Sequence, residues 1–290
     1  MNASSNFRAP ASDGLAWRYL RTGVAYVLIS FGAILTALPF LWMLLSSFKG
    51  NADIAAIPLR WLPTEWRPQN YAVIWEMMPF ARYYLNSIIV AVAQTGGVLL
   101  TASLAAYSFA RIPFTGRNVA FFLYLGTIMI PGWVTLIPVF TIVKNLGWLN
   151  TYQGLIVPGL TSAMGTFLLR QFFLTIPQDL EDAGFVDGAN RLQVYARIML
   201  PLAKPALLTV GLITFMGSWN SLTWPLIIAS SDEMRTLPLG LAQLAVLGGW
   251  VRIEWGPLMA ATLLSILPVM LIYVFLQQYF IRGIALTGLK

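Results

Sequence analysis

Clustered carboxylates are the residues of this chain that could carry out chemistry, and they lie within residues 179–187. The cluster has four acidic side chains: Asp179, Glu181, Asp182 and Asp187. Neighbouring carboxyl groups can act as a general acid and a general base. The chain contains no His and no Cys, which excludes Ser-His-Asp and Cys-His catalysis, Cys/His zinc sites and disulfides. A catalytic role would rest on these carboxylates alone. Capping of a helix, together with docking of another protein on the segment, explains them adequately without catalysis.

The polar segment that holds the cluster, residues 176–201, is expected to form two short helices joined by a turn. Pro177 suits a first helical turn, where its missing N–H is not needed. The acidic residues after it lie at the positive end of the helix dipole. Gly188 supplies the backbone freedom for a turn. Asn190 is then expected to cap the second helix, with Gln193 as its capping-box partner.

The second helix of this segment is expected to carry an apolar face. Its apolar side chains recur at i, i+3, i+6 and i+7: Leu192, Tyr195, Ile198 and Met199. Pro201 and Pro205 are expected to end the helix. One interpretation is a solvated loop that only connects membrane helices. Loops of this length without a role are uncommon in compact proteins, which favours a functional segment.

The composition indicates a membrane protein. Of the 290 residues, 58% are hydrophobic and 10% are charged, and the mean hydropathy is +0.72. An ordinary soluble domain has about 25% charged residues, so the lipid bilayer is the expected surrounding. The formal charge of +7 is scattered over single residues. No basic stripe forms, and we expect no nucleic-acid partner.

Six charge-free stretches predict an all-α membrane protein with six transmembrane helices. They are residues 22–48, 83–110, 118–143, 145–169, 205–231 and 255–281. Each exceeds the ~20 residues that a helix needs to cross the hydrocarbon core. In the fourth stretch the helix is expected to begin near Gln153, with an interruption at Pro158 and Gly159. Residues 236–251 are too short and too broken for a crossing, and are expected to form an external or interfacial segment.

The distribution of Lys and Arg predicts the orientation. With the N-terminus inside, 11 of the 18 basic residues lie on the cytoplasmic side and 7 outside, as the positive-inside rule prefers. Residues 1–21 then form a cytoplasmic tail, 22–281 the six-helix domain and 282–290 a second cytoplasmic tail. A cytoplasmic helix-turn-helix, residues 176–205, joins helices 4 and 5. Residues 49–82, rich in Pro and Trp, are expected to form an ordered external loop.

The helix-turn-helix resembles the coupling loop of binding-protein-dependent ABC importers, which reads Glu-Ala-Ala, then Gly, then Ile-x-Leu-Pro. Here Asp182-Ala183-Gly184 takes the first place, Gly188 the second and residues 198–201 the third. The chain departs from the pattern twice. Asp182 replaces Glu and keeps the charge on a shorter side chain. Gly184 replaces Ala, which is expected to loosen the helix by roughly 1 kcal/mol.

The resemblance extends along nearly the whole chain, to the shorter, six-helix permease subunit of the maltose-type carbohydrate importers. The matching blocks include RYYLNSIIVA (82–91), LAAYSFARIPFTGR (104–117), IPGWVTLIPVF (130–140), GSWNSLTWPLI (217–227) and LQQYFIRGIALTGLK (276–290). The resemblance implies a multi-pass protein of the bacterial plasma (inner) membrane.

The resemblance also implies partners and site residues. A second permease subunit would form a heterodimer with this chain, a cytoplasmic ABC ATPase dimer would bind ATP and Mg, and an extracytoplasmic binding protein would deliver sugar. This chain would bind no cofactor. The implied ATPase-coupling residues are Glu181, Asp182, Ala183, Gly184, Asp187, Gly188, Ala189, Ile198, Leu200 and Pro201. The implied ATPase contacts of the tail are Thr287 and Gly288.

A path for sugar is expected to carry uncharged polar and aromatic groups, because sugars are neutral and rich in hydroxyls. The candidates are Asn86, Gln94, Ser218, Trp219, Asn220 and Thr223. Hydrogen bonding between helices is the competing interpretation for each of them.

Two other classes of protein compete with the importer permease. An ion-coupled secondary transporter of a neutral solute usually places ionisable residues inside the membrane, and the six stretches here have none. A membrane-embedded hydrolase or transferase would need the carboxylates of residues 179–187 as its acid and base. The chain lacks a GxxxxGK[ST] motif, so we do not expect it to be the ATPase.

Overall fold

The computed structural model describes residues 15–247 and 254–287, and this part of the chain is helical without strands. The elements follow in this order: α1 (Leu15–Ser46), α2 (Asn51–Ile54), α3 (Asn70–Met77), α4 (Phe80–Arg111), α5 (Arg117–Gly126), η1 (Thr127–Met129), α6 (Gly132–Asn145), α7 (Tyr152–Ile156), η2 (Val157–Gly159), α8 (Ala163–Thr175), α9 (Asp179–Val186), α10 (Arg191–Val194), η3 (Tyr195–Met199), α11 (Leu200–Leu202), α12 (Lys204–Trp219), α13 (Thr223–Ile228), α14 (Leu237–Leu247) and α15 (Trp255–Thr287).

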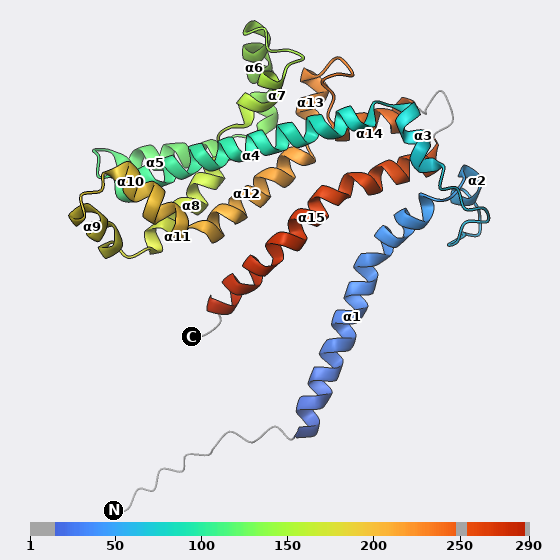
Figure 1. Ribbon diagram of the computed structural model, residues 1–290, viewed down its shortest axis with the longest axis horizontal. Helices are drawn as coiled ribbons and strands as arrows, with labels where there is room; N and C mark the ends of the chain where they lie inside the picture. The colour runs from blue at the N-terminus through green and yellow to red at the C-terminus, as the bar shows by residue number, and fades with distance from the viewer. Residues whose placement is uncertain (1–14, 248–253, 288–290) are drawn as a thin grey trace, which may run out of the picture.

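Helix α4 is the axis of the fold. It packs most extensively against α8 and α12, and the small side chains of Ala102, Ala106 and Ala110 are buried along it. Small residues let helix backbones approach closely where lipid provides no hydrophobic driving force. Figure 1 shows α8, α9 and α10 gathered at one end of α4, with α3 and α14 at the other. The polar helix-turn-helix is therefore held at one end of the long central helix.

The described residues contain three helices that are long and apolar enough to cross a membrane: Tyr19–Ser46, Phe80–Arg111 and Trp255–Phe275. Two bent helix pairs raise the number to five if each pair is one span. These helices match the first, second and sixth predicted stretches. The all-helical membrane-type fold is thus confirmed, whereas the count of six spans stays a prediction.

The other predicted stretches are interrupted. In the third, the pair Arg117–Met129 and Gly132–Asn145 is bent by 98°. Pro131 lies at this break, and it can donate no N–H to a continuing helix. The fourth stretch is broken by η2, at the predicted Pro158 and Gly159. In the fifth, α12 ends at Trp219 and a separate short helix, α13, follows.

Helix α1 diverges from the rest of the fold (Figure 1) and leaves its apolar side chains uncovered by the chain itself. None of its most apolar window is buried within the described structure. Such a surface is compatible with lipid or another apolar partner and unfavourable in water.

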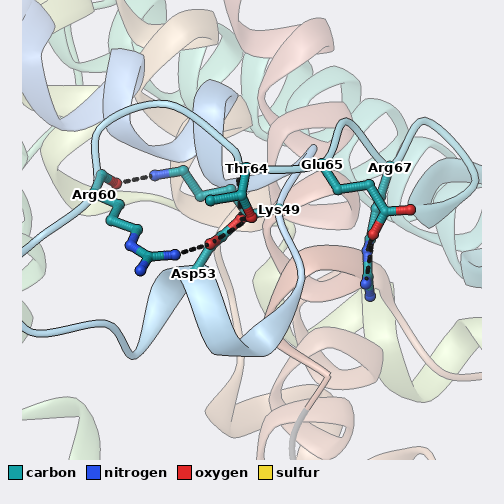
Figure 2. A network of polar contacts seen from close by, with 6 residues as sticks. All are labelled: Lys49, Asp53, Arg60, Thr64, Glu65 and Arg67. Carbon is teal, nitrogen blue, oxygen red and sulfur yellow. Dashed lines mark hydrogen bonds and ion pairs between the residues drawn. The ribbon is translucent and has the colours of Figure 1, made fainter.

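The loop that follows α1 is ordered by a polar network (Figure 2). Lys49 is fully buried, donates from Nζ to the carbonyl oxygen of Arg60 at 2.6 Å, and lies 3.9 Å from the ring centre of Trp42. Asp53 accepts hydrogen bonds from the backbone N–H of Thr64 at 2.8 Å and from the Thr64 hydroxyl. Arg60 forms an ion pair with Asp53 at 3.2 Å. These contacts close residues 49–64 into a compact loop.

The hydrogen bonds from Thr64 lower the pKa of Asp53 below its ordinary value of 3.8, and Arg60 adds to the effect. A carboxylate with a lowered pKa stabilises the fold fully above its unfolded pKa, and this contribution is lost as the pH falls through the folded pKa.

We predict that residues 49–64 become susceptible to pepsin as the pH falls through the lowered pKa of Asp53, where the folded protein takes up the proton. Thr64→Val removes the hydroxyl donor, raises the pKa of Asp53 and should move the onset of cleavage to higher pH. Thr141→Val is the matched control, because the Thr141 hydroxyl bonds only within its own helix, to the carbonyl oxygen of Ile137. Identical onsets for Thr64→Val and the unmodified protein would contradict the assignment.

Candidate functional site

The polar segment forms the two predicted short helices, α9 and α10. The second continues through η3 and α11 to Leu202, so Pro201 does not end it as predicted; a proline is tolerated there because it lies in the first turn of α11. Three of the four acidic residues, Asp179, Glu181 and Asp182, occupy the first turn of α9, and Asp187 caps its C-terminal end. The helix begins at Asp179, so Pro177 lies two residues before the first turn in which it was predicted. Gly188 has a φ of 83°, a left-handed conformation that favours glycine, and it makes the turn. The predicted capping box is confirmed. The Gln193 N–H donates to Asn190 Oδ1 at 2.9 Å, and the Asn190 N–H donates to Gln193 Oε1 at 2.8 Å.

Glu181 points into the protein. Its Oε1 lies 2.8 Å from Arg111 Nε, and the side chains of Arg111 and Glu181 are 12% and 5% exposed. The Tyr107 hydroxyl donates to Glu181 Oε2 at 3.3 Å. Arg111 also donates from Nη2 to the carbonyl oxygens of Phe173, at 2.7 Å, and Ile176. One guanidinium therefore ties the end of α4 to the end of α8 and to α9.

Gly184 lies where α9 packs against the next helices. A Cβ at this position would come within 2.8 Å of Ile198 Cδ1 and 3.3 Å of Val194 Cγ2. The sequence predicts that this glycine loosens α9. The structure adds a packing role, because the missing side chain lets α9 approach the second helical segment closely.

The apolar face of the second helix differs from the predicted one. Leu192 is 66% exposed, while Val194, Tyr195 and Met199 are buried. Residues Tyr195–Met199 form a π-helical turn, whose i→i+5 hydrogen bonds change the angular spacing of the side chains. The Tyr195 hydroxyl lies 2.7 Å from Ser103 Oγ of α4. The prediction placed Leu192 on the apolar face because it assumed regular α-helical periodicity.

The outer surface of the hairpin combines acidic and apolar side chains. The residues Asp182, Ala183, Asp187, Gly188 and Pro201 are exposed. Ala189, Ile198 and Leu200 are half-buried, and Glu181 and Gly184 are buried. Exposed apolar side chains flank the carboxylates: Leu180, Val186 and Leu192 are 44%, 87% and 66% exposed. We call the set Leu180, Asp182, Val186, Asp187 and Leu192 the hairpin face.

Sequence reasoning missed several residues of this region. Leu180 and Val186 were not singled out, although an apolar residue in an otherwise polar loop is a visible signal. Arg111 and Tyr107 were not connected to the loop at all. Arg111 is the first charged residue after a long apolar stretch, which is the signal that could have drawn attention to it. In the tail, Thr287 ends α15, and Gly288 lies outside the described residues.

The candidate path residues fall into two groups. Four of them, Asn86, Ser218, Trp219 and Asn220, are not among the residues that line the cavity described below. Asn86 is fully buried, donates to the carbonyl oxygens of Glu233 and Arg235, both at 2.8 Å, and accepts from the Tyr152 hydroxyl at 2.6 Å. Trp219 is buried and donates to the carbonyl oxygen of Ser265.

Asn220 donates to the carbonyl oxygen of Met216, one turn back in α12. The buried hydroxyl of Ser218 has no hydrogen-bond partner within the described residues. Gln94 and Thr223 form the second group, because both line a cavity of about 450 Å³.

Replacing Arg111 should show how strongly the free energy of unfolding depends on the pairing of the buried Glu181 carboxylate. We predict that Arg111→Met destabilises the protein by about 3–5 kcal/mol, because Glu181 stays buried without a cationic partner. Adding Glu181→Gln should recover part of this loss. Thermal unfolding of the detergent-solubilised protein measures both effects. Arg117→Met is the matched control, since Arg117 forms no ion pair among the described residues. Equal stabilities of the single and double variants would show that the pair is not coupled.

The chain resembles several permease proteins over most of its length. It is 33% identical over 275 residues to the probable ABC transporter permease protein YurM of Bacillus subtilis, covering 94% of this chain and 90% of YurM. It is 32% identical to the diacetylchitobiose uptake system permease protein NgcG of Streptomyces coelicolor, covering 88% and 84%. It is 31% identical to the sn-glycerol-3-phosphate transport system permease protein UgpE of Yersinia pestis, covering 89% and 94%.

The fold also resembles a solved structure. A chain of a bacterial ABC transporter involved in the import of the acidic polysaccharide alginate superposes with a TM-score of 0.78 and 25% sequence identity. The match covers 94% of this chain and 99% of that one.

The family of binding-protein-dependent transport system inner membrane components matches residues 97–286. This range is 190 of the 290 residues and contains the hairpin, Arg111 and the α12–α13 break. The family is one of transport permeases that work with an ATPase and a binding protein. The chain therefore belongs to the binding-protein-dependent transport system inner membrane components, as a permease subunit of an ABC importer.

Proposed function

We propose that this permease is one of two non-identical subunits that together enclose the path of a sugar importer, and that its hairpin face docks on the cytoplasmic ATPase. The hairpin face supports the proposal. It exposes two carboxylates among three apolar side chains, a combination that suits a protein–protein contact better than a solvated connecting loop. The chain would cross the membrane six times, with the hairpin and both termini in the cytoplasm.

Rigid attachment of the hairpin explains how docking could move the membrane helices. The Arg111–Glu181 pair and the two carbonyl contacts of Arg111 fix α9 to the ends of α4 and α8. Gly184 and the Tyr195–Ser103 contact add close packing. A displacement of the hairpin by a closing ATPase dimer would therefore be passed to α4 and α8 instead of being absorbed in a loose loop.

The nucleotide chemistry of this proposal takes place on the partner. ATP and Mg would bind to the ATPase dimer, and this chain would contribute the docking surface. Thr287, the last residue of α15, and Gly288 after it would supply a second contact to the ATPase. The cargo is proposed to be a sugar or polyol because NgcG is named for diacetylchitobiose, and the alginate importer for a polysaccharide.

Changes on the hairpin should separate docking from folding. We predict that Asp182→Arg and Gly188→Val lower ATP-dependent uptake by about tenfold or more, the effect of losing ~1.4 kcal/mol or more of docking energy. Val at residue 188 would also be strained at positive φ.

Co-purification with the ATPase checks the docking directly. Glu76→Arg makes the same charge reversal on an exposed residue of α3 and should leave uptake unchanged. Undiminished ATPase association in both hairpin variants would refute the docking role.

The energy source distinguishes an ATP-driven importer from an ion-coupled carrier. We predict that uptake by intact cells survives collapse of the proton gradient and stops when ATP is depleted, because the predicted spans hold no ionisable group to couple an ion. Solute uptake with a protonophore in one arm and ATP depletion in the other measures this. The reverse pattern would favour the secondary carrier.

A further inference from the structure

A cavity of about 450 Å³ opens beside the middle of α4. Gln94, the fifteenth of the 32 residues of α4, lines it. The other lining residues come from α6, η2, the break between α12 and α13, and the start of α13. They include Trp133, Thr135, Gly159, Ser221, Thr223 and Trp224. The volume lies in the usual range of small-molecule sites, roughly 300–1,000 Å³.

Three helix interruptions meet at this cavity. Helix α6 begins after Pro131, η2 separates α7 from α8, and residues 220–222 separate α12 from α13. Residues beside each interruption line the cavity. Irregular backbone at membrane depth is tolerated where it is buried in protein or lines a water-filled cavity. Transporters commonly place their solute sites where such broken helices converge.

Gln94 is held in a defined orientation at the cavity. Its Nε2 donates to the carbonyl oxygen of Leu155 at 2.9 Å. A Cβ on Gly159 would lie 2.6 Å from Nε2, so the absent side chain of Gly159 makes room for the amide. Within the described residues Gln94 Oε1 accepts no hydrogen bond. The geometry therefore leaves an acceptor for a ligand hydroxyl, and the Thr223 hydroxyl also forms no hydrogen bond within the described residues.

The aromatic and charge content of the lining defines the class of ligand. Trp133 is 72% exposed, and Trp224 is fixed because its Nε1 donates to the carbonyl oxygen of Gly154 at 2.9 Å. No Asp, Glu, Lys or Arg lines the cavity. An anion here would lack a cationic partner from this chain, and burying an unpaired charge is costly. Indole rings, amides and hydroxyls instead suit a neutral ligand that carries both apolar faces and hydroxyl groups.

We propose that this cavity is a subsite for an uncharged, hydroxyl-rich solute, with Gln94 and Thr223 as hydrogen-bonding residues and Gly159 as the residue that positions Gln94. The inference rests on the proposed import function, and it adds that the cargo is a neutral saccharide or polyol. An anion such as sn-glycerol-3-phosphate, or an acidic saccharide, would be a poor ligand for this subsite.

The first test measures uptake by the complete importer, with its ATPase and binding protein, in proteoliposomes. The neutral probes are maltose, diacetylchitobiose and glycerol, and the anionic probes are sn-glycerol-3-phosphate and glucuronate. We expect import of a neutral probe, with an apparent KM raised about tenfold by Gln94→Leu and by Thr223→Val, as expected for a lost hydrogen bond of ~1.4 kcal/mol. Gly159→Ala should raise it as well. Gln171→Leu and Thr141→Val, on exposed residues outside the cavity, should not.

The second test uses the absence of native cysteine in this chain. A single Thr223→Cys variant in the complete importer should react with a small neutral maleimide, and the transported neutral probe should slow the reaction severalfold, while the anionic probes should not. Preferential import of an anionic probe would overturn the inference and leave ATP-driven import standing. Import of no neutral probe, or an unchanged KM in the Gln94 and Thr223 variants, would overturn it as well.

Discussion

The arrangement of the hairpin depends on one buried ion pair, between Arg111 and Glu181. Transferring both charges out of water is expensive, and their attraction offsets that cost only when other groups complete the hydrogen bonding. Here the Tyr107 hydroxyl and two backbone carbonyl oxygens provide those groups. The carbonyl oxygens belong to the last turn of α8 and the residue after it, where helix ends leave acceptors unsatisfied. A single guanidinium thus donates hydrogen bonds to a helix end and forms an ion pair with a buried carboxylate.

This ion pair distinguishes Glu181 from the other three residues of the acidic cluster. Its four carboxylates look alike in the sequence, yet Glu181 is buried while Asp179, Asp182 and Asp187 remain exposed. Glu181 attaches the hairpin to α4, and the other three acidic side chains lie on its surface. Substituting Asp for the usual Glu at residue 182 shortens an exposed side chain, which leaves the internal attachment unaffected. The departures from the family pattern therefore fall on the surface and at the close contact of Gly184.

Local features of the fold could be predicted from the sequence because their causes are local. The capping box of Asn190 and Gln193 and the turn at Gly188 follow from neighbouring residues, and the long helices α1, α4 and α15 follow from unbroken apolar stretches. The contact between Arg111 and Glu181 joins residues seventy positions apart, and no periodicity reports it. The outward position of Leu192 follows from a π-helical turn, which local propensity does not indicate. The 98° bend at Pro131 combines a visible proline with a direction that only tertiary packing determines.

Helix α4 connects the cavity at Gln94 to the hairpin at Arg111. Gln94 and Arg111 are 17 residues apart on one helix, which corresponds to about 26 Å at 1.5 Å per residue. The helix contains no proline and runs as one α-helix from Phe80 to Arg111, so a single continuous element joins the cavity to the hairpin. Gly97 lets it pack closely on Leu160, just after η2.

A movement of the hairpin that turns α4 would therefore move Gln94 against η2 and α6. Because the walls opposite Gln94 are made of broken helices, they can change position relative to α4 without disrupting a continuous helix. The same interruptions that form the cavity would then let it open and close.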